Sequence, residues 1–220
     1  MGRIRKKSPS APSPRVRQKR ARTRREILDA ARKLLLTGGV EAVTLASVAA
    51  ELDLTKQALY HYFPSKEALL KSLIAALLED EIDAITTAVK AAGPDSDVLG
   101  IMIRAFYAHY IHALEAFRVI YCQMQLLPMT AIRLDEEMLR EEINPQTRRL
   151  FDLLEDRLAG EGKSKAQRRR ARRLAYSAWL SALGMMTMLS VADSAQDSLI
   201  YSDKELLATL TDVFDEATHH

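Results

Sequence analysis

Cysteine, glycine, proline and β-type sequence patterns are all scarce in this chain of 220 residues. Its single cysteine, Cys122, cannot form an intrachain disulfide, which argues against a disulfide-stabilised secreted fold. The chain has only eight glycines and seven prolines, and no β-branched run alternates with polar residues at period two, so we expect an all-α fold. No apolar signal segment stands at the N-terminus, and a cytoplasmic location is therefore expected.

Residue patterns typical of an enzyme are also missing. The sequence contains no recognisable Ser/His/Asp set, phosphate-binding loop or paired catalytic carboxylates, so we expect no catalytic activity and no cofactor. One metal set is conceivable, because His109 and His112 lie three residues apart with Glu115 next and Cys122 in the following helix. Histidines beside tyrosines more often form hydrogen bonds in a core or pocket, and no metal site is predicted.

The charge of the chain is distributed unevenly. The first 25 residues hold 11 of the 32 Lys and Arg residues and none of the 29 Asp and Glu residues, so the remainder is acidic overall. Residues 1–21 are also rich in serine and proline, and we expect a disordered basic arm. Such an arm could follow a DNA backbone or enter a minor groove, or it could be a solvated tail. The positive N-terminal end is typical of DNA binding.

The stretch from Thr44 to Lys66 predicts two short helices joined by a tight turn. Thr44 and Thr55 are suited to cap the two helices, and the second is expected to run from Lys56 to Phe63. The apolar residues of the first helix recur at i, i+3, i+4 and i+7: Leu45, Val48, Ala49 and Leu52. Two helices of this length around a three-residue turn form a helix-turn-helix, whose second helix fits the major groove of DNA.

The outward face of the second helix carries groups that suit DNA. Gln57, Tyr60 and His61 share one face at i, i+3 and i+4, and Lys56 precedes them. Glutamine can pair with adenine and lysine can reach guanine, while tyrosine and threonine hydroxyls suit phosphates. The alternative is a three-helix module in which the tyrosines only pack. Against it, hydroxyl and basic groups are rarely found along the buried face of a helix, because burying unpaired polar groups is costly.

The residues around this helix resemble the DNA-binding domain of TetR-family transcriptional regulators over about residues 22–73. The resemblance rests on the run from Tyr60 to Glu67, YHYFPSKE, preceded by Thr55-Lys56 and Val48-Ala49. It implies phosphate contacts from Thr44, Thr55, Tyr60, Tyr62 and Lys66. It implies base-reaching positions at Lys56, Gln57 and His61. The chain departs from the family at Asp53, where many members have a glycine before the recognition helix.

The rest of the N-terminal domain and its link to the second domain are also expected to be helical. A first helix is predicted from Thr23 to Thr37, ended by Gly38 and Gly39. A long helix capped by Ser65 is predicted to continue to about Lys90, so that it starts at DNA and ends in a second domain. We therefore divide the chain into the arm, a helix-turn-helix domain at 22–73 and a larger helical domain at 74–218.

The second domain is expected to bind a small molecule and to dimerise. TetR-family regulators commonly hold an effector cavity there, and the resemblance implies a homodimer formed by the last two helices that binds a pseudo-palindromic operator. We expect a largely apolar effector whose polar groups are read by tyrosine, histidine or Gln123. The candidate lining residues are Met102, Phe106, His109, Tyr110, Tyr121, Met124, Tyr176 and Trp179. A helical ligand- or partner-binding protein without operator binding is the alternative.

Residues 174–192 carry no charge and follow a cluster of arginines, which permits a membrane span. Several serines and small residues dilute its hydrophobicity, so a buried helix at the dimer interface is expected, with no membrane contact. Capping boxes are predicted at Ser164 with Gln167 and at Ser202 with Glu205. The arginine cluster is expected to be solvated or paired with acids of residues 135–142.

Overall fold

The computed structural model describes residues 13–122, 136–160, 162–195 and 201–219, and every regular element within these ranges is helical. The all-α expectation is confirmed. Three helices form the N-terminal domain: α1 (Pro14–Ala42), α2 (Leu45–Glu51) and α3 (Lys56–Tyr60). The larger C-terminal part contains α4 (Lys66–Ala91), α5 (Val98–Tyr110), α6 (Leu114–Phe117), the π-helix η1 (Arg118–Cys122), α8 (Glu136–Met138), the π-helix η2 (Leu139–Ile143), α9 (Asn144–Ala159), α10 (Lys165–Ala195) and α11 (Asp203–His219).

Helix α1 begins earlier than the sequence predicted. It was expected to start at Thr23 after a disordered arm reaching residue 21, but residues 14–21 are helical. Ser13 accepts a hydrogen bond from the backbone N–H of Val16, and Pro14 occupies the first helical position, where its missing N–H costs nothing. The arginine, lysine and alanine residues that follow are good helix formers. The remaining part of the predicted arm, residues 1–12, lies outside the described ranges.

Helices α2 and α3 form the expected helix-turn-helix. Val48 and Leu59 are fully buried between them, and Phe63 closes the same core at 1% exposure. The recognition helix is shorter than predicted, because α3 ends at Tyr60 and a turn at His61 and Tyr62 brings Phe63 inward. The turn before α3 contains Asp53 at φ 54°, the left-handed conformation that suits the glycine found in many family members.

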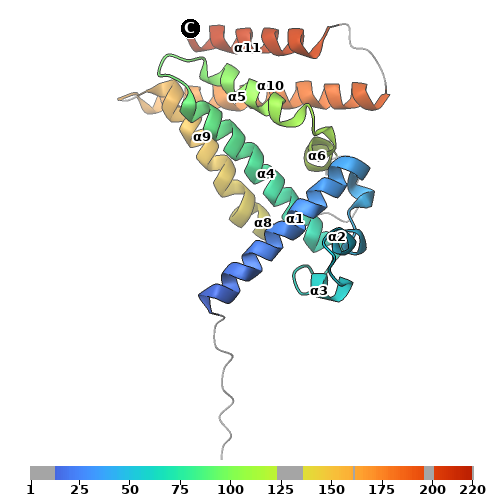
Figure 1. Cartoon of the computed structure of the whole chain (residues 1–220). Coiled ribbons are helices and arrows are strands. Elements are labelled where there is room, and N and C mark those ends of the chain that lie inside the picture. Colours follow the sequence, from blue (N-terminus) through green and yellow to red (C-terminus); the bar gives the residue numbers. More distant parts are fainter. Residues whose placement is uncertain (1–12, 123–135, 161, 196–200, 220) are drawn as a thin grey trace, which may run out of the picture.

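Helix α4 joins the two parts of the molecule. It begins beside α3 and runs upward beside α9 to the level of α5 (Figure 1). The helices α10 and α11 lie across the end of the molecule remote from α3 (Figure 1). A continuous hydrophobic core extends from α1 through α4 and α5 to α10. The expected long helix, capped by Ser65 and ending near residue 90, is confirmed.

The last two helices begin at the predicted capping boxes. The backbone N–H of Ser164 donates to Gln167 Oε1 at 2.9 Å, and that of Ser202 donates to Glu205 Oε2 at 2.9 Å. Helix α10 includes a stretch, Lys165–Val191, that is long and apolar enough to cross a membrane by length and composition alone, a test that core helices also pass. In this fold α10 packs against α5, α9 and α11.

Candidate DNA interface and effector site

The capping threonines position both helices of the helix-turn-helix. Thr44 Oγ1 accepts the backbone N–H of Ser47 at 3.0 Å, and Thr55 Oγ1 accepts that of Ala58 at 3.1 Å. A hydroxyl has one donor in addition to its acceptor lone pairs, so the O–H of exposed Thr55 is available to a phosphate oxygen. The caps therefore stabilise α2 and α3 and also present a hydroxyl where α3 begins.

The outward residues of α3 form an exposed polar face. Lys56, Gln57 and His61 are exposed, and Tyr60 is 41% exposed with Lys56 Nζ lying 5.9 Å from its ring centre. The other predicted DNA contacts, Thr44, Tyr62 and Lys66, are half-buried. The eight residues lie at the N-caps of α2 and α3, on α3 itself, in the turn after it or at the start of α4. The side chains predicted to reach bases are thus all exposed, as are Thr55 and Tyr60 among the predicted phosphate contacts.

The basic N-terminal half of α1 lies beside the end of α3. Arg20 donates from its guanidinium to the backbone carbonyl of His61 at 3.5 Å, so the two segments meet at the recognition tip. The side chains of residues 14–22 are all exposed. The exposed basic residues on this part of α1 are Arg15, Arg17, Lys19, Arg20 and Arg22. Part of the basic region that the sequence assigned to a disordered arm, residues 14–21, is therefore helical, and Arg20 connects it to the turn after α3.

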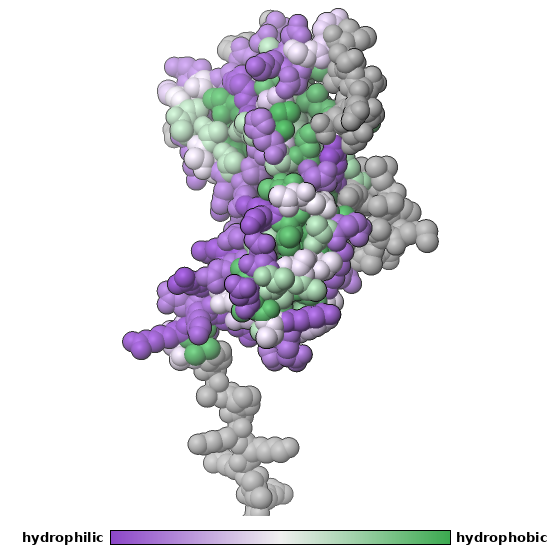
Figure 2. All heavy atoms as spheres, turned by 45° about the vertical axis from the view of Figure 1, so that its right-hand side comes forward, coloured by the Kyte–Doolittle hydropathy of each residue, from purple (hydrophilic) through white to green (hydrophobic). Residues whose placement is uncertain are grey.

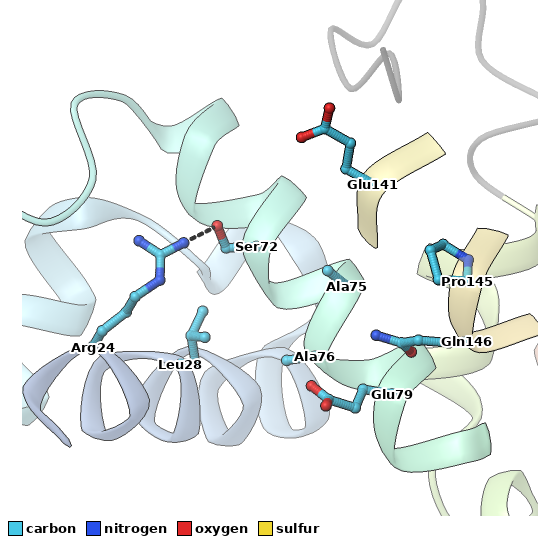
Figure 3. A pocket seen from close by; sticks show the side chains of 9 residues that line it. All are labelled: Arg24, Leu28, Ser72, Ala75, Ala76, Glu79, Glu141, Pro145 and Gln146. Carbon is cyan, nitrogen blue, oxygen red and sulfur yellow. Dashed lines mark hydrogen bonds between the residues drawn. The ribbon is translucent and has the colours of Figure 1, made fainter. Parts of the chain in front are cut away.

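Two side-chain pairs fasten α1 to α4. Arg24 donates to Ser72 Oγ at 2.6 Å, and its guanidinium lies 4.4 Å from the ring centre of Phe63. Arg32 pairs with Asp80 about two helical turns further along both helices. A pocket of about 420 Å³ opens beside the first pair, lined by α1, α4, η2 and α9 (Figure 3). These two pairs connect α1 to the first four turns of α4.

An aromatic cluster occupies the centre of the C-terminal part. Phe106 and Tyr110 on α5 are fully buried, with ring centres 5.3 Å apart in an edge-to-face arrangement. Tyr121 on η1 lies 6.1 Å from Phe106 and 6.3 Å from Trp179 on α10. Phe117, which the sequence analysis did not select, joins them at 5.4 Å from Tyr110. Four predicted effector-site residues from three elements are thus brought together.

The remaining predicted effector-site residues lie apart from this cluster or at its edge. Met102 is fully buried on α5, and half-buried His109 stacks edge-on to Tyr110 at 4.7 Å. Burial lowers the pKa of His109, so the imidazole is neutral near pH 7. Tyr176 is 50% exposed and lines a surface pocket of about 660 Å³ between α9 and α10. Met124 and Gln123 lie outside the described residues.

The sequence analysis missed Glu81, the acid at the centre of the cluster. Glu81 is 1% exposed, and its Oε2 accepts hydrogen bonds from Tyr110 at 2.5 Å and from Tyr121 at 2.7 Å. Burial raises the pKa of Glu81 to about 7, although both tyrosine hydroxyls act in the opposite direction. The available signal was periodicity, because Glu81 continues the buried i+4 stripe of Leu77 and Ile85.

The arginine cluster of α10 is paired with a neighbouring helix. Arg172 donates to Asp152 at 2.7 Å and Arg168 to Asp156 at 2.6 Å, both on α9. The expected pairing with acids of residues 135–142 is therefore wrong for these two arginines, because the α9–α10 hairpin brings α9 closer. Within the described ranges, no three His, Cys, Asp or Glu side chains converge as a metal site.

Comparison with known proteins identifies the N-terminal domain. Residues 27–73 match the sequence model described as bacterial regulatory proteins of the tetR family. Over 70 residues the chain is 43% identical to the HTH-type transcriptional repressor KstR of Mycolicibacterium smegmatis, a match that covers 32% of this chain and 34% of the relative. The chain thus spans about a third of that relative's length.

The fold of nearly the whole chain is found in solved structures. A regulatory protein designated SCO4313 superposes with a TM-score of 0.68 at 18% identity, covering 92% of this chain and 98% of that one. FadR from Bacillus subtilis, solved in complex with stearoyl-CoA, gives a TM-score of 0.58 at 17% identity, covering 86% and 96%. Residues 27–73 are thus similar in sequence to bacterial regulatory proteins of the tetR family, and nearly the whole chain shares the all-helical fold of these solved structures.

Proposed function

We propose that the protein is a homodimeric transcriptional regulator, acting as a repressor, that leaves its operator when a small molecule binds the C-terminal part. The observation that carries the proposal is the exposed face of α3, where Lys56, Gln57 and Tyr60 project beside the basic half of α1. Helix-turn-helix proteins read bases from such a helix and hold phosphates with the groups around it. A cytoplasmic location follows from this role.

Phosphate contacts are proposed for the rim of this face. Thr44, Thr55, Tyr60, Tyr62 and Lys66 would anchor the backbone, while Gln57, Lys56 and His61 would read base edges. Ser65 accepts the backbone N–H of Ala68 at 3.1 Å and caps α4, so the positive end of a 26-residue helix lies beside Lys66. The dipole of this helix would favour a phosphate at that point.

Dimerisation through α10 and α11 is supported by an apolar stripe on α10. Four of its residues, spaced by multiples of three or four, are between 46% and 58% exposed: Tyr176, Leu180, Met188 and Val191. Gly184 stands in the middle of the stripe with open space above it, which permits close approach of another helix. Hydrophobic surface is also visible among hydrophilic atoms in the upper part of Figure 2. An apolar stripe of this length suits a self-complementary interface.

Effector control would act through α4. The aromatic cluster contacts α4 at Glu81, and the next residue toward the DNA end, Asp80, is paired with Arg32 of α1. A ligand that displaces α4 at the cluster would therefore also displace α1 and the recognition helix. Two recognition helices that bind half-sites one turn of B-DNA apart must be about 34 to 36 Å from each other. A modest displacement of each helix would therefore lower operator affinity.

Binding to the DNA upstream of the protein's own gene tests the proposal. Tyr60→Ala is expected to weaken binding to all sequences roughly equally, whereas Gln57→Ala should relax specificity at one position by about 1 to 3 kcal/mol. Fluorescence anisotropy at several salt concentrations separates these effects. Arg149→Ala, which removes an exposed pair with Asp83 far from α3, is the control. A protein that forms no salt-sensitive complex with any duplex would instead be a ligand- or partner-binding protein.

A further inference from the structure

Glu81 is a buried acid without a cationic partner. Within the described ranges no lysine, arginine or histidine forms an ion pair with it, and its interactions there are the two tyrosine hydroxyls. A buried carboxylate normally pairs with a cation or coordinates a metal, since desolvating an unpaired charge is costly. The core of this domain therefore holds an acidic group whose natural complement is absent from the part of the chain that the structure describes.

The groups around Glu81 suit an organic cation. Aromatic rings from three elements surround the two tyrosines that hold the carboxylate: Phe106, Phe117 and Trp179. The faces of aromatic rings attract ammonium groups within about 6 Å, most strongly where water is excluded. A carboxylate packed among aromatic rings differs from an anion site, which would need arginine, lysine or helix N-termini.

The cluster also has an edge and an irregular element from which a ligand can act. Tyr121 and Trp179 are half-buried, in contrast to the fully buried Phe106 and Tyr110. Tyr121 belongs to the π-helix η1, and single π-helical turns within helices occur frequently at functional sites. Tyr121 and Trp179, whose ring centres are 6.3 Å apart, are therefore the partly exposed edge of the cluster, and Tyr121 also donates a hydrogen bond directly to Glu81.

We propose that the effector of this protein carries a basic or quaternary nitrogen, which pairs with the Glu81 carboxylate between the rings of Tyr110, Tyr121 and Trp179. This inference rests on the proposed function, because it specifies the chemistry of the effector site. It narrows the largely apolar effector expected from the sequence to an amphipathic cation. The same contact places the ligand's charge against α4, one residue from the Asp80–Arg32 pair.

Trp179 is the only tryptophan in the chain, and its fluorescence reports on the cluster directly. The full-length protein is titrated with phenyltrimethylammonium, with its neutral isostere tert-butylbenzene and with the anion benzenesulfonate. The cation is expected to bind at least tenfold more tightly than the neutral isostere, and the anion more weakly than both. Equal binding of cation and isostere, or no binding of the cation, overturns the inference.

Matched variants test whether the preference for the cation depends on the Glu81 carboxylate. Glu81→Gln keeps the shape and removes the charge, so the preference for the cation should fall to about twofold or less. Glu79→Gln, on the exposed side of the same helix, should retain the wild-type preference. If Glu81→Gln does not fold, Tyr121→Phe serves instead: it keeps the carboxylate and the ring and should retain at least the wild-type preference. A preference that persists in Glu81→Gln, or disappears in Tyr121→Phe, contradicts the assignment.

A gel shift on the same preparation separates this inference from the proposed function. A protein that binds operator DNA but does not prefer the cation remains a regulator with an effector of another class. If the protein prefers the cation through Glu81 but binds no DNA duplex, the cation site is supported and the proposed role as a DNA-binding regulator is wrong.

Discussion

At the scale of single residues, Asp53 shows how the helix-turn-helix turn is built without glycine. Its φ of 54° is the left-handed conformation, which costs most residues roughly 1 to 2 kcal/mol but is tolerated better by aspartate and asparagine. We expect Asp53→Gly to equal or exceed the wild-type free energy of unfolding. Asp53→Val should lower it by about 1 to 2 kcal/mol, because a β-branched side chain clashes in this conformation. Urea denaturation measures both.

Two further variants make the Asp53 experiment specific to the backbone. Asp53→Asn should leave the unfolding free energy within about 0.5 kcal/mol of wild type, since asparagine also adopts the left-handed conformation. Asp95→Val changes another exposed aspartate, in a turn without positive φ, and should have a small effect. If Asp53→Val were as stable as Asp95→Val, backbone strain would not govern this turn.

The buried acid Glu81 is expected to make folding pH-dependent. Its pKa is raised from 4.5 to about 7 in the folded protein, so the folded state holds the proton more tightly than the unfolded state. The contribution of Glu81 to the unfolding free energy is therefore largest below pH 4.5. It decreases as the pH rises toward 7, by up to roughly 3 kcal/mol in total. Urea denaturation between pH 5 and 8 should show this loss in the wild type, and Glu81→Gln should remove it.

The comparison between wild type and variant is needed because neighbouring groups also titrate. His109 has a lowered pKa, so its contribution to the unfolding free energy rises with pH and opposes that of Glu81. Tyr110 and Tyr121 have pKa values raised by burial and stay neutral over this range. Glu79→Gln should keep the wild-type pH profile. An unchanged profile in Glu81→Gln would mean that Glu81 titrates as it does in the unfolded chain.

The sequence pattern is more specific for the predicted DNA-facing residues than for the predicted effector-site residues, for a physical reason. Exposed groups such as Gln57 and Tyr60 cannot be explained by packing, so their pattern alone indicates a function. Buried aromatic residues such as Phe106 occur both in hydrophobic cores and in binding sites, so their presence in the sequence does not distinguish the two. In the sequence, Glu81 could be recognised only as a charged residue within the apolar stripe of α4. Its hydrogen-bond partners, Tyr110 and Tyr121, lie on other helices, and the pattern of α4 does not predict which residues pack against it.

At the scale of elements, local signals fixed most helix starts and failed where two signals competed. Ser65, Ser164 and Ser202 begin the helices predicted from them, because a cap depends only on nearby backbone groups. The composition of residues 14–21 favoured disorder, whereas Ser13 and Pro14 begin a helix there. The end of α3 was predicted from the inward position of Phe63, which a turn satisfies equally well.

The pair between Arg32 and Asp80 is the element-scale link between α1 and α4. Its side chains are 34% and 45% exposed, so solvent screens the attraction considerably. A double-mutant cycle with Arg32→Gln and Asp80→Asn should give a coupling energy of about 0.5 to 1 kcal/mol by urea denaturation. The larger effect is expected on regulation: in the double variant, an effector should release the operator less completely than in the wild type.

The control for this link is an ion pair that joins no two elements. Arg22 and Glu26 pair at 2.9 Å within α1 and are 82% and 47% exposed, so their coupling energy should not exceed about 0.5 kcal/mol. Breaking that pair should leave effector release unchanged. Equal loss of release in both double variants would show that the specific contact between α1 and α4 is not what matters.

At the scale of the whole molecule, the two proposed activities occupy opposite ends. The exposed face of α3 and the basic half of α1 lie at one end, while α10 and α11 lie across the other (Figure 1). Helix α4 connects them and carries Glu81 about midway along its length. The proposed dimer at the far end would fix the distance between two recognition helices, so a small rotation at the cluster would produce a larger displacement at the DNA.

Dimerisation is therefore expected to be a condition for operator binding. The variant Leu180→Asp places a charge on the α10 stripe, where Leu180 is 46% exposed. Burying that charge between two copies would be costly, so we expect sedimentation to detect monomers at micromolar concentration. Leu36→Asp alters a residue of similar exposure, 42%, on α1 and should leave the dimer intact. A monomer places only one recognition helix on the operator, which should reduce affinity at least a hundredfold while its salt-dependent binding to random DNA changes much less. A Leu180→Asp protein that remains dimeric and binds the operator normally would exclude α10 as the interface.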